Sequence, residues 1–180
     1  EIEKYKTYFA GNIYVHNQKG ADDTSRTNFP DTAYWNPHLK TDKDGKAEIE
    51  IKLPDSLTTW RIAAIANSQE AAFGSQVSEF VVSRDILIRP FLPRFLSVGD
   101  EARIGAIVVN TSGEEQTIRA KIEGEGIQIQ DNKSQQLVLA DGAQTKIVWS
   151  TVTGNAKSAK IKLSIEGIDK SLKDAVEMTL

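Results

Sequence analysis

The sequence predicts an all-β protein made of two tandem antiparallel β-sandwich domains, and three observations support this prediction. Apolar and polar residues alternate with a period of two in several short segments, which is the pattern of strands with one buried face. Turn-forming residues separate these segments at intervals of about 8–12 residues, as in sandwiches and barrels. No segment of a dozen residues has apolar residues at helical spacing. The 180 residues suit two domains of roughly 80–100 residues each.

Individual strands and turns follow from the alternation and from glycine-containing pairs. The alternation is clearest in residues 47–53, 118–123, 135–139 and 159–166. Turn signals lie at Asp44-Gly45, Ser112-Gly113, Gly124-Glu125-Gly126, Asp141-Gly142 and Gly154-Asn155. Residues of these types favour the tight connections between antiparallel strands. We therefore expect consecutive short strands joined by tight turns over most of the chain.

Two runs are apolar on both faces, residues 60–66 and 104–109, and we expect them to be central strands. Pro90 and Pro93 remove ladder donors, which favours an edge or inter-domain strand. The change in pattern predicts a domain boundary at residues 83–88. The predicted sections are 1–28, a strand or hairpin with a linker over 18–28; 29–85, a first sandwich; and 86–180, a second sandwich.

The composition excludes several classes of site and partner. The chain has no cysteine, which rules out disulfides, zinc-thiolate sites, thiol nucleophiles and an internal thioester within it. A net charge of −3, with both signs interspersed, offers no basic face for nucleic acid or anionic lipid. The apolar runs are too short to span a bilayer. We expect neither nucleic-acid binding nor direct membrane insertion.

Nothing in the sequence supports a catalytic, metal or cofactor site. His16 and His38 are the two histidines, and neither has a partner at ligand spacing. Residues 42–45 resemble a calcium loop superficially, but the glycine stands too early and the closing glutamate is missing, so a polar turn is expected. No serine lies in a nucleophile-elbow pattern. We predict no enzymatic activity, no catalytic residue, no bound metal and no cofactor.

Two further patterns are interpreted as structural. Asn110 and Asn132 each begin a glycosylation tripeptide, but such tripeptides are common by chance and both lie in turns. Trp35, Trp60 and Trp149 are interpreted as core anchors rather than as an aromatic ligand platform. A stand-alone adhesion or carbohydrate-binding β-sandwich is the alternative function, because sandwiches serve many unrelated roles.

The most specific pattern lies in residues 28–61. It begins with Asn-Phe-Pro-Asp-Thr-Ala-Tyr-Trp-Asn-Pro at residues 28–37 and ends with Leu-Pro-Asp-Ser-Leu-Thr-Thr-Trp-Arg at residues 53–61. This pattern resembles the signature of the α2-macroglobulin family, which is shared with complement components. Residues 90–100 resemble the beginning of the family's next macroglobulin-like domain. The matching signature positions are Phe29, Pro30, Thr32, Trp35, Pro54, Asp55, Thr58 and Trp60.

The resemblance implies a non-catalytic structural fragment of a broad-spectrum endopeptidase inhibitor that traps proteases after cleavage of a bait segment. Its partners would be the other domains of the parent chain and, through the parent, the target endopeptidases. Because cysteines are absent, the resemblance favours a bacterial member, located in the periplasm, secreted or held at the cell surface by a lipoprotein anchor elsewhere in the parent. Cleavage upstream is expected to release residues 18–28 while the core strands stay folded.

Overall fold

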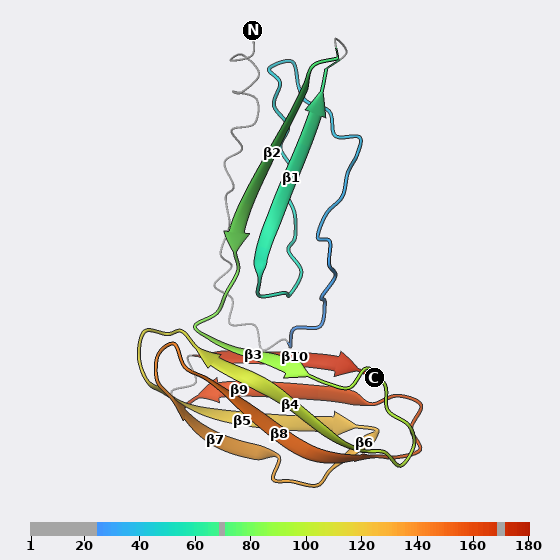
Figure 1. Ribbon diagram of the computed structural model, residues 1–180, viewed down its shortest axis with the longest axis vertical. Helices are drawn as coiled ribbons and strands as arrows, with labels where there is room; N and C mark the ends of the chain where they lie inside the picture. Colours follow the sequence, from blue (N-terminus) through green and yellow to red (C-terminus); the bar gives the residue numbers. More distant parts are fainter. Residues whose placement is uncertain (1–24, 69–70, 169–171) are drawn as a thin grey trace. The chain divides into compact units, whose positions relative to one another are not determined.

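The computed structural model describes residues 25–68, 71–168 and 172–180, which contain ten β-strands and no helix (Figure 1). The predicted all-β class is confirmed. The described residues form two compact units, one of residues 28–82 and one of residues 25–27 together with 83–180. The predicted sections 1–28, 29–85 and 86–180 stay a prediction, and residues 1–24, His16 among them, lie outside the described part of the chain.

The second unit is a sandwich of two four-stranded sheets in which every neighbouring strand pair is antiparallel. One sheet has the order β10 (Lys173–Thr179), β9 (Lys160–Gly167), β5 (Gln116–Glu125) and β7 (Ser134–Leu139). The other has the order β3 (Ile86–Phe91), β4 (Glu101–Asn110), β8 (Gln144–Thr153) and β6 (Ile127–Ile129). The strands predicted at 118–123, 135–139 and 159–166 correspond to β5, β7 and β9.

One apolar core fills the space between the two sheets. Strand β5 buries Ile118, Ala120 and Ile122 and exposes Arg119 and Lys121, so the period-two alternation directly sets which face is dry. Aliphatic residues of β4 and β8 close the core from the opposite sheet. Burial of these side chains is the main source of stability for this unit.

Trp149 on β8 is the largest side chain in this core, and its surface is 0% exposed. Its indole N–H donates a 3.0 Å hydrogen bond to the Asn132 carbonyl oxygen, so its one polar group is also satisfied. The prediction that Trp149 anchors a core is confirmed.

The proline-containing run lies at the edge of a sheet, as predicted. Strand β3 contains Pro90 and pairs only with β4, so the missing N–H leaves no central ladder bond unmade. Opposite Phe91, β4 places Gly105, where a Cβ atom would collide with the Phe91 ring and with the Ile147 carbonyl oxygen. Lys146 also lies over the Phe91 ring, 4.5 Å from its centre.

In the first unit, the described residues show fewer strands than the predicted sandwich requires. Its described residues form one antiparallel pair, β1 (Thr59–Asn67) and β2 (Phe73–Val81), with Trp60 opposite Phe80. Residues 47–53 alternate but form no strand, and the run 60–66 lies in a two-stranded sheet rather than at the centre of a larger one. Alternation predicts which face of a strand is buried, but a strand forms only beside a neighbour with which it can pair.

The two-stranded sheet leaves large apolar side chains in water. Ile65 is 83% exposed and Phe73 is 78% exposed. Trp35, which we expected in a core, is 81% exposed, because the described residues of this unit provide no second layer on which it could pack. A pair of strands alone is marginally stable at best.

Candidate functional site

A buried charged cluster lies in the second unit, at the edge of strand β10. Among the described strands, β10 pairs with β9 on one side. On its other side Arg26 forms an isolated parallel bridge with Val176. The Arg26 N–H donates to the Ala175 carbonyl oxygen (2.8 Å), and the Glu177 N–H donates to the Arg26 carbonyl oxygen (3.0 Å). Arg26 therefore covers part of the edge of β10, whereas sequence polarity had suggested that it belongs to a linker.

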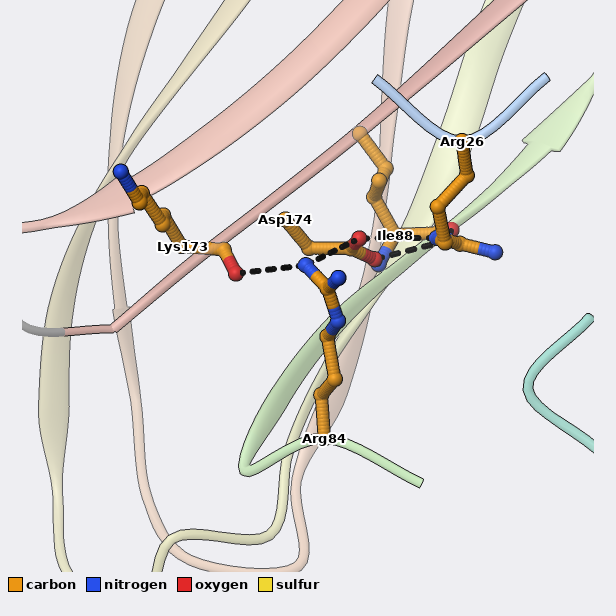
Figure 2. Close-up of polar contacts among 5 residues, drawn as sticks. All are labelled: Arg26, Arg84, Ile88, Lys173 and Asp174. Carbon is orange, nitrogen blue, oxygen red and sulfur yellow. Dashed lines mark hydrogen bonds and ion pairs between the residues drawn. The ribbon is translucent and has the colours of Figure 1, made fainter. Parts of the chain in front are cut away.

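Asp174 is the centre of this cluster (Figure 2). It is a residue of β10 and is 2% exposed. Arg26 binds its carboxylate in a bidentate manner, with Nε 2.8 Å from Oδ1 and Nη2 2.7 Å from Oδ2. The backbone N–H of Ile88 donates to Oδ2 over 2.9 Å. Bidentate arginine–carboxylate pairs are among the strongest and most directional polar contacts in proteins.

A second arginine binds the same carboxylate from its outer side. Arg84 Nη1 lies 3.2 Å from Asp174 Oδ1 and donates to the Lys173 carbonyl oxygen, also over 3.2 Å. The Arg84 side chain is 38% exposed, whereas that of Arg26 is 9% exposed. Arg26 therefore forms the buried half of the cluster and Arg84 the solvent-facing half.

The cluster also connects the two sheets of the sandwich. Arg26 Nη2 donates to the Ile88 carbonyl oxygen over 2.8 Å, in addition to binding Asp174. Ile88 belongs to β3 and Asp174 to β10, which are the edge strands of different sheets and lie side by side (Figure 1). The backbone N–H and the carbonyl oxygen of Ile88 are thus both hydrogen-bonded within the cluster, which closes one side of the sandwich.

Along the chain, the cluster stands at both ends of the described part of the first unit, residues 28–82. Arg26 lies two residues before residue 28, and Arg84 lies two residues after residue 82. A single buried carboxylate thus fixes the second-unit residues next to both of these ends. The sequence offers one signal for it: Asp174 shares its phase with Val176 and Met178, so the alternation places a carboxylate on the inward face of a strand.

The eight signature residues lie in the first unit and do not converge on a shared polar site. Pro54 is buried and Asp55 is half-buried. The Asn28 N–H donates to Asp55 Oδ2 over 2.9 Å, and the Asp55 N–H donates to the Asn28 carbonyl oxygen, also over 2.9 Å. This reciprocal pair holds the two ends of the signature together. Phe29, Pro30, Thr32, Trp35 and Thr58 are exposed.

Trp60 is half-buried in β1, and its indole nitrogen is enclosed without a hydrogen-bond partner among the residues that the structure describes. An enclosed donor without an acceptor costs free energy, so this indole is less well accommodated than that of Trp149. The assignment of the signature residues to a structural role stays a prediction.

The other candidates from the sequence have structural roles. Asp42 Oδ1 accepts the N–H groups of Asp44 and Lys46, each over 2.9 Å, which confirms the polar turn. Asn110 is 0% exposed, and its amide donates to carbonyl oxygens inside the second unit, so a glycan at this position is incompatible with the fold. His38 is exposed. Across the described ranges there is no group of three or more acidic or histidine side chains placed to hold a metal, and no helix able to cross a membrane.

Comparisons with known proteins agree with the resemblance. Residues 32–122 match the Alpha-2-macroglobulin family. An alpha-2-macroglobulin homolog of Nostoc sp. is 39% identical over 93 residues, which are 52% of this chain and 5% of that protein. The alpha-2-macroglobulin of Thermotoga maritima is 32% identical over 156 residues, which are 86% of this chain and 10% of that protein.

Structural comparison supports the fold. The crystal structure of trypsin-activated alpha-2-macroglobulin from Escherichia coli matches with a TM-score of 0.69 at 17% identity, over 87% of this chain and 12% of that chain. The chain spans about a tenth or less of the length of the relatives from Nostoc sp. and Thermotoga maritima. Since the family match includes six of the eight signature residues and covers half of the 180 residues, this chain belongs to the alpha-2-macroglobulin family.

Proposed function

We propose that this chain is a non-catalytic structural section of a larger bacterial inhibitor that traps endopeptidases after they cleave it. The observation that carries the proposal is the family match over residues 32–122, which begins within the signature and continues into the second unit. The polar cluster at Asp174 supports a structural role, because its carboxylate is fully occupied by two guanidinium groups and a backbone amide.

The proposed role has two parts. The second unit, with its closed apolar core, would move as a rigid body when the parent rearranges, since packed cores resist internal deformation. The first unit would make contacts with other parts of the parent. In this proposal the parent is located outside the cytoplasm, where it meets foreign proteases; cell fractionation with an antibody to this chain tests that location.

A trapping assay with the full-length parent tests the proposal. Trypsin incubated with the parent should lose activity toward a large protein substrate while keeping activity toward a small chromogenic peptide, because an enclosed protease remains accessible to small molecules only. The 180-residue chain alone should change neither activity. Equal loss of both activities with the parent would indicate active-site inhibition and contradict a trap.

The alternative of an adhesion or carbohydrate-binding module has one specific observation in its favour. Trp35 is 81% exposed beside Tyr34, which is 41% exposed, and the Tyr34 hydroxyl accepts a 3.0 Å hydrogen bond from the Asn36 amide. Exposed aromatic rings of this kind stack on sugars. Saturable binding to a glycan array that is lost in Trp35→Ala would favour the alternative over the trap.

A further inference from the structure

We propose that Arg26, Asp174 and Arg84, together called the Asp174 latch, protect the Arg26–Thr27 peptide bond from proteases and set the downstream limit of the segment that a cut can release. The latch itself is a property of this chain. Its part in limiting release rests on the proposed trapping function.

The side chain of Arg26 is withheld from a protease by its pairing with Asp174. A trypsin-like protease cuts after arginine only when the guanidinium enters its specificity pocket and pairs with an acidic group there. In this protein the guanidinium is buried, and Asp174 holds it through two hydrogen bonds of 2.8 and 2.7 Å. Asp174 therefore already binds the guanidinium group that the protease would need to bind.

The backbone of Arg26 is also withheld from a protease, because it is hydrogen-bonded to strand β10. A protease binds its substrate as an extended strand and needs the backbone polar groups around the scissile bond. Here the N–H and the carbonyl oxygen of Arg26 are already bonded to Ala175 and Glu177 of β10. Cleavage would require that residues 25–27 first detach from the strand edge by local unfolding.

The contacts of Arg26 also set the point at which a segment released by a cut upstream would still be attached. Arg26 is bound to strands of both sheets, to β10 through Asp174 and the backbone and to β3 through the Ile88 carbonyl oxygen. Detaching Arg26 would break these contacts together and uncover the edge of β10. A segment freed by a cut before residue 25 would therefore remain attached at Arg26, and residues 28–82 would stay tethered at both of their ends.

The two arginines should contribute unequally. Arg84 makes longer contacts, 3.2 Å each, and is more exposed, so solvent screens its pairing with Asp174. Arg26→Lys keeps a charge and remains a trypsin site but loses the planar fork that binds both carboxylate oxygens. Asp174→Asn keeps the shape of the side chain and removes its charge. The expected order of sensitivity to cleavage is wild type, then Arg84→Gln, then Arg26→Lys and Asp174→Asn.

Limited trypsin digestion of the 180-residue chain, read by mass spectrometry, tests the latch directly. The rate of cleavage after Arg26 is measured relative to cleavage after Lys157, which is exposed and lies between β8 and β9 in the same unit. Relative to wild type, Asp174→Asn and Arg26→Lys should raise this ratio by about 10–100-fold, which corresponds to the loss of one charge-assisted hydrogen bond. Glu123→Gln, an exposed carboxylate on β5, is the matched control and should leave the ratio unchanged.

Hydrogen exchange separates loss of the latch from loss of the fold. In Asp174→Asn the amide of Glu177 should lose protection by at least about 10-fold, because its acceptor is the Arg26 carbonyl oxygen, while β4 and β8 keep theirs. If β4 and β8 also lose protection, Arg26→Lys serves as the deciding variant. Rapid cleavage after Arg26 in the wild type, or the same ratio in wild type and Arg26→Lys, would overturn the latch.

The parent protein then tests the limit on release. After a protease cuts the parent, the new ends should lie before residue 25, and the Glu177 amide should stay protected. Loss of that protection in a parent that traps normally would overturn the limit and leave the proposed function intact. A parent that fails to trap would contradict the proposed function, and the digestion result on the isolated chain would be unaffected.

Discussion

Replacement of Trp149 tests how the core of the second unit is stabilised. The side chain is 0% exposed on β8, and its N–H donates a 3.0 Å hydrogen bond to the Asn132 carbonyl oxygen. Truncation to alanine should cost about 3–5 kcal/mol, as large core truncations do. Phenylalanine keeps much of the apolar volume but loses the hydrogen bond, so Trp149→Phe should cost about 1–3 kcal/mol. Against a total stability of about 5–15 kcal/mol, the alanine variant is expected to be only marginally folded.

Trp60→Phe is the matched comparison. No described residue accepts a hydrogen bond from the enclosed Trp60 indole nitrogen, so phenylalanine removes an unsatisfied donor and should cost at most about 1 kcal/mol. Urea unfolding followed by hydrogen exchange of peptides from each unit gives the free energy change for each variant separately. Equal destabilisation by the two Trp→Phe changes would refute the reasoning, because it would mean that hydrogen bonding of the indole does not distinguish the two sites.

The remaining predictions concern three other sites of the second unit. Gly105→Ala places a methyl group against the Ile147 carbonyl oxygen and should lower the unfolding free energy by about 1–3 kcal/mol in urea titrations, whereas no change would mean that β4 shifts freely. Asn110→Ala removes the donor of the buried hydrogen bond to the Leu139 carbonyl oxygen and should cost about 1–3 kcal/mol by the same measurement; a neutral effect would refute this. The hydrogen bond from Lys160 to Glu177, and then the charge of that carboxylate, raise the pKa of Lys160 above its ordinary 10.5. The stabilisation of the fold by the Lys160–Glu177 ion pair is therefore complete at neutral pH and is lost as the pH rises through the raised pKa of Lys160. The difference in melting temperature between the wild type and Lys160→Gln should therefore shrink above pH 10.5.

The local sequence pattern was sufficient to predict strands of the second unit, because alternation and turn residues occur there together. Residues 118–123 alternate, end at the turn around Gly126, and become part of β5 between two neighbours. The same alternation in residues 47–53 led to a wrong prediction of a strand. The difference lies outside the segment, since β5 has β7 and β9 beside it, whereas no described strand pairs with residues 47–53. Sequence periodicity describes one face of a strand and contains no information about the partner.

The cluster at Asp174 could be predicted only in part. A carboxylate in phase with Val176 indicates a charged group on an inward face, and such a group requires a cationic partner. The partners cannot be read from spacing, because Arg84 and Arg26 stand 90 and 148 residues away. Arginines in polar segments are normally solvated, and only the fold brings these two to one carboxylate.

This long-range pairing changes the expectation for residues 18–28. Polarity alone predicted a linker that a cut upstream would set free over its whole length. A charged residue indicates solvent exposure only when no buried group of opposite charge lies within reach, and Arg26 has such a group in Asp174. Because the pair is buried, separating it would leave the Asp174 carboxylate with only the Ile88 amide and the more exposed Arg84 as partners, which is costly. Residues 25–27 should therefore behave after cleavage as part of the second unit, and the freed linker should end before them.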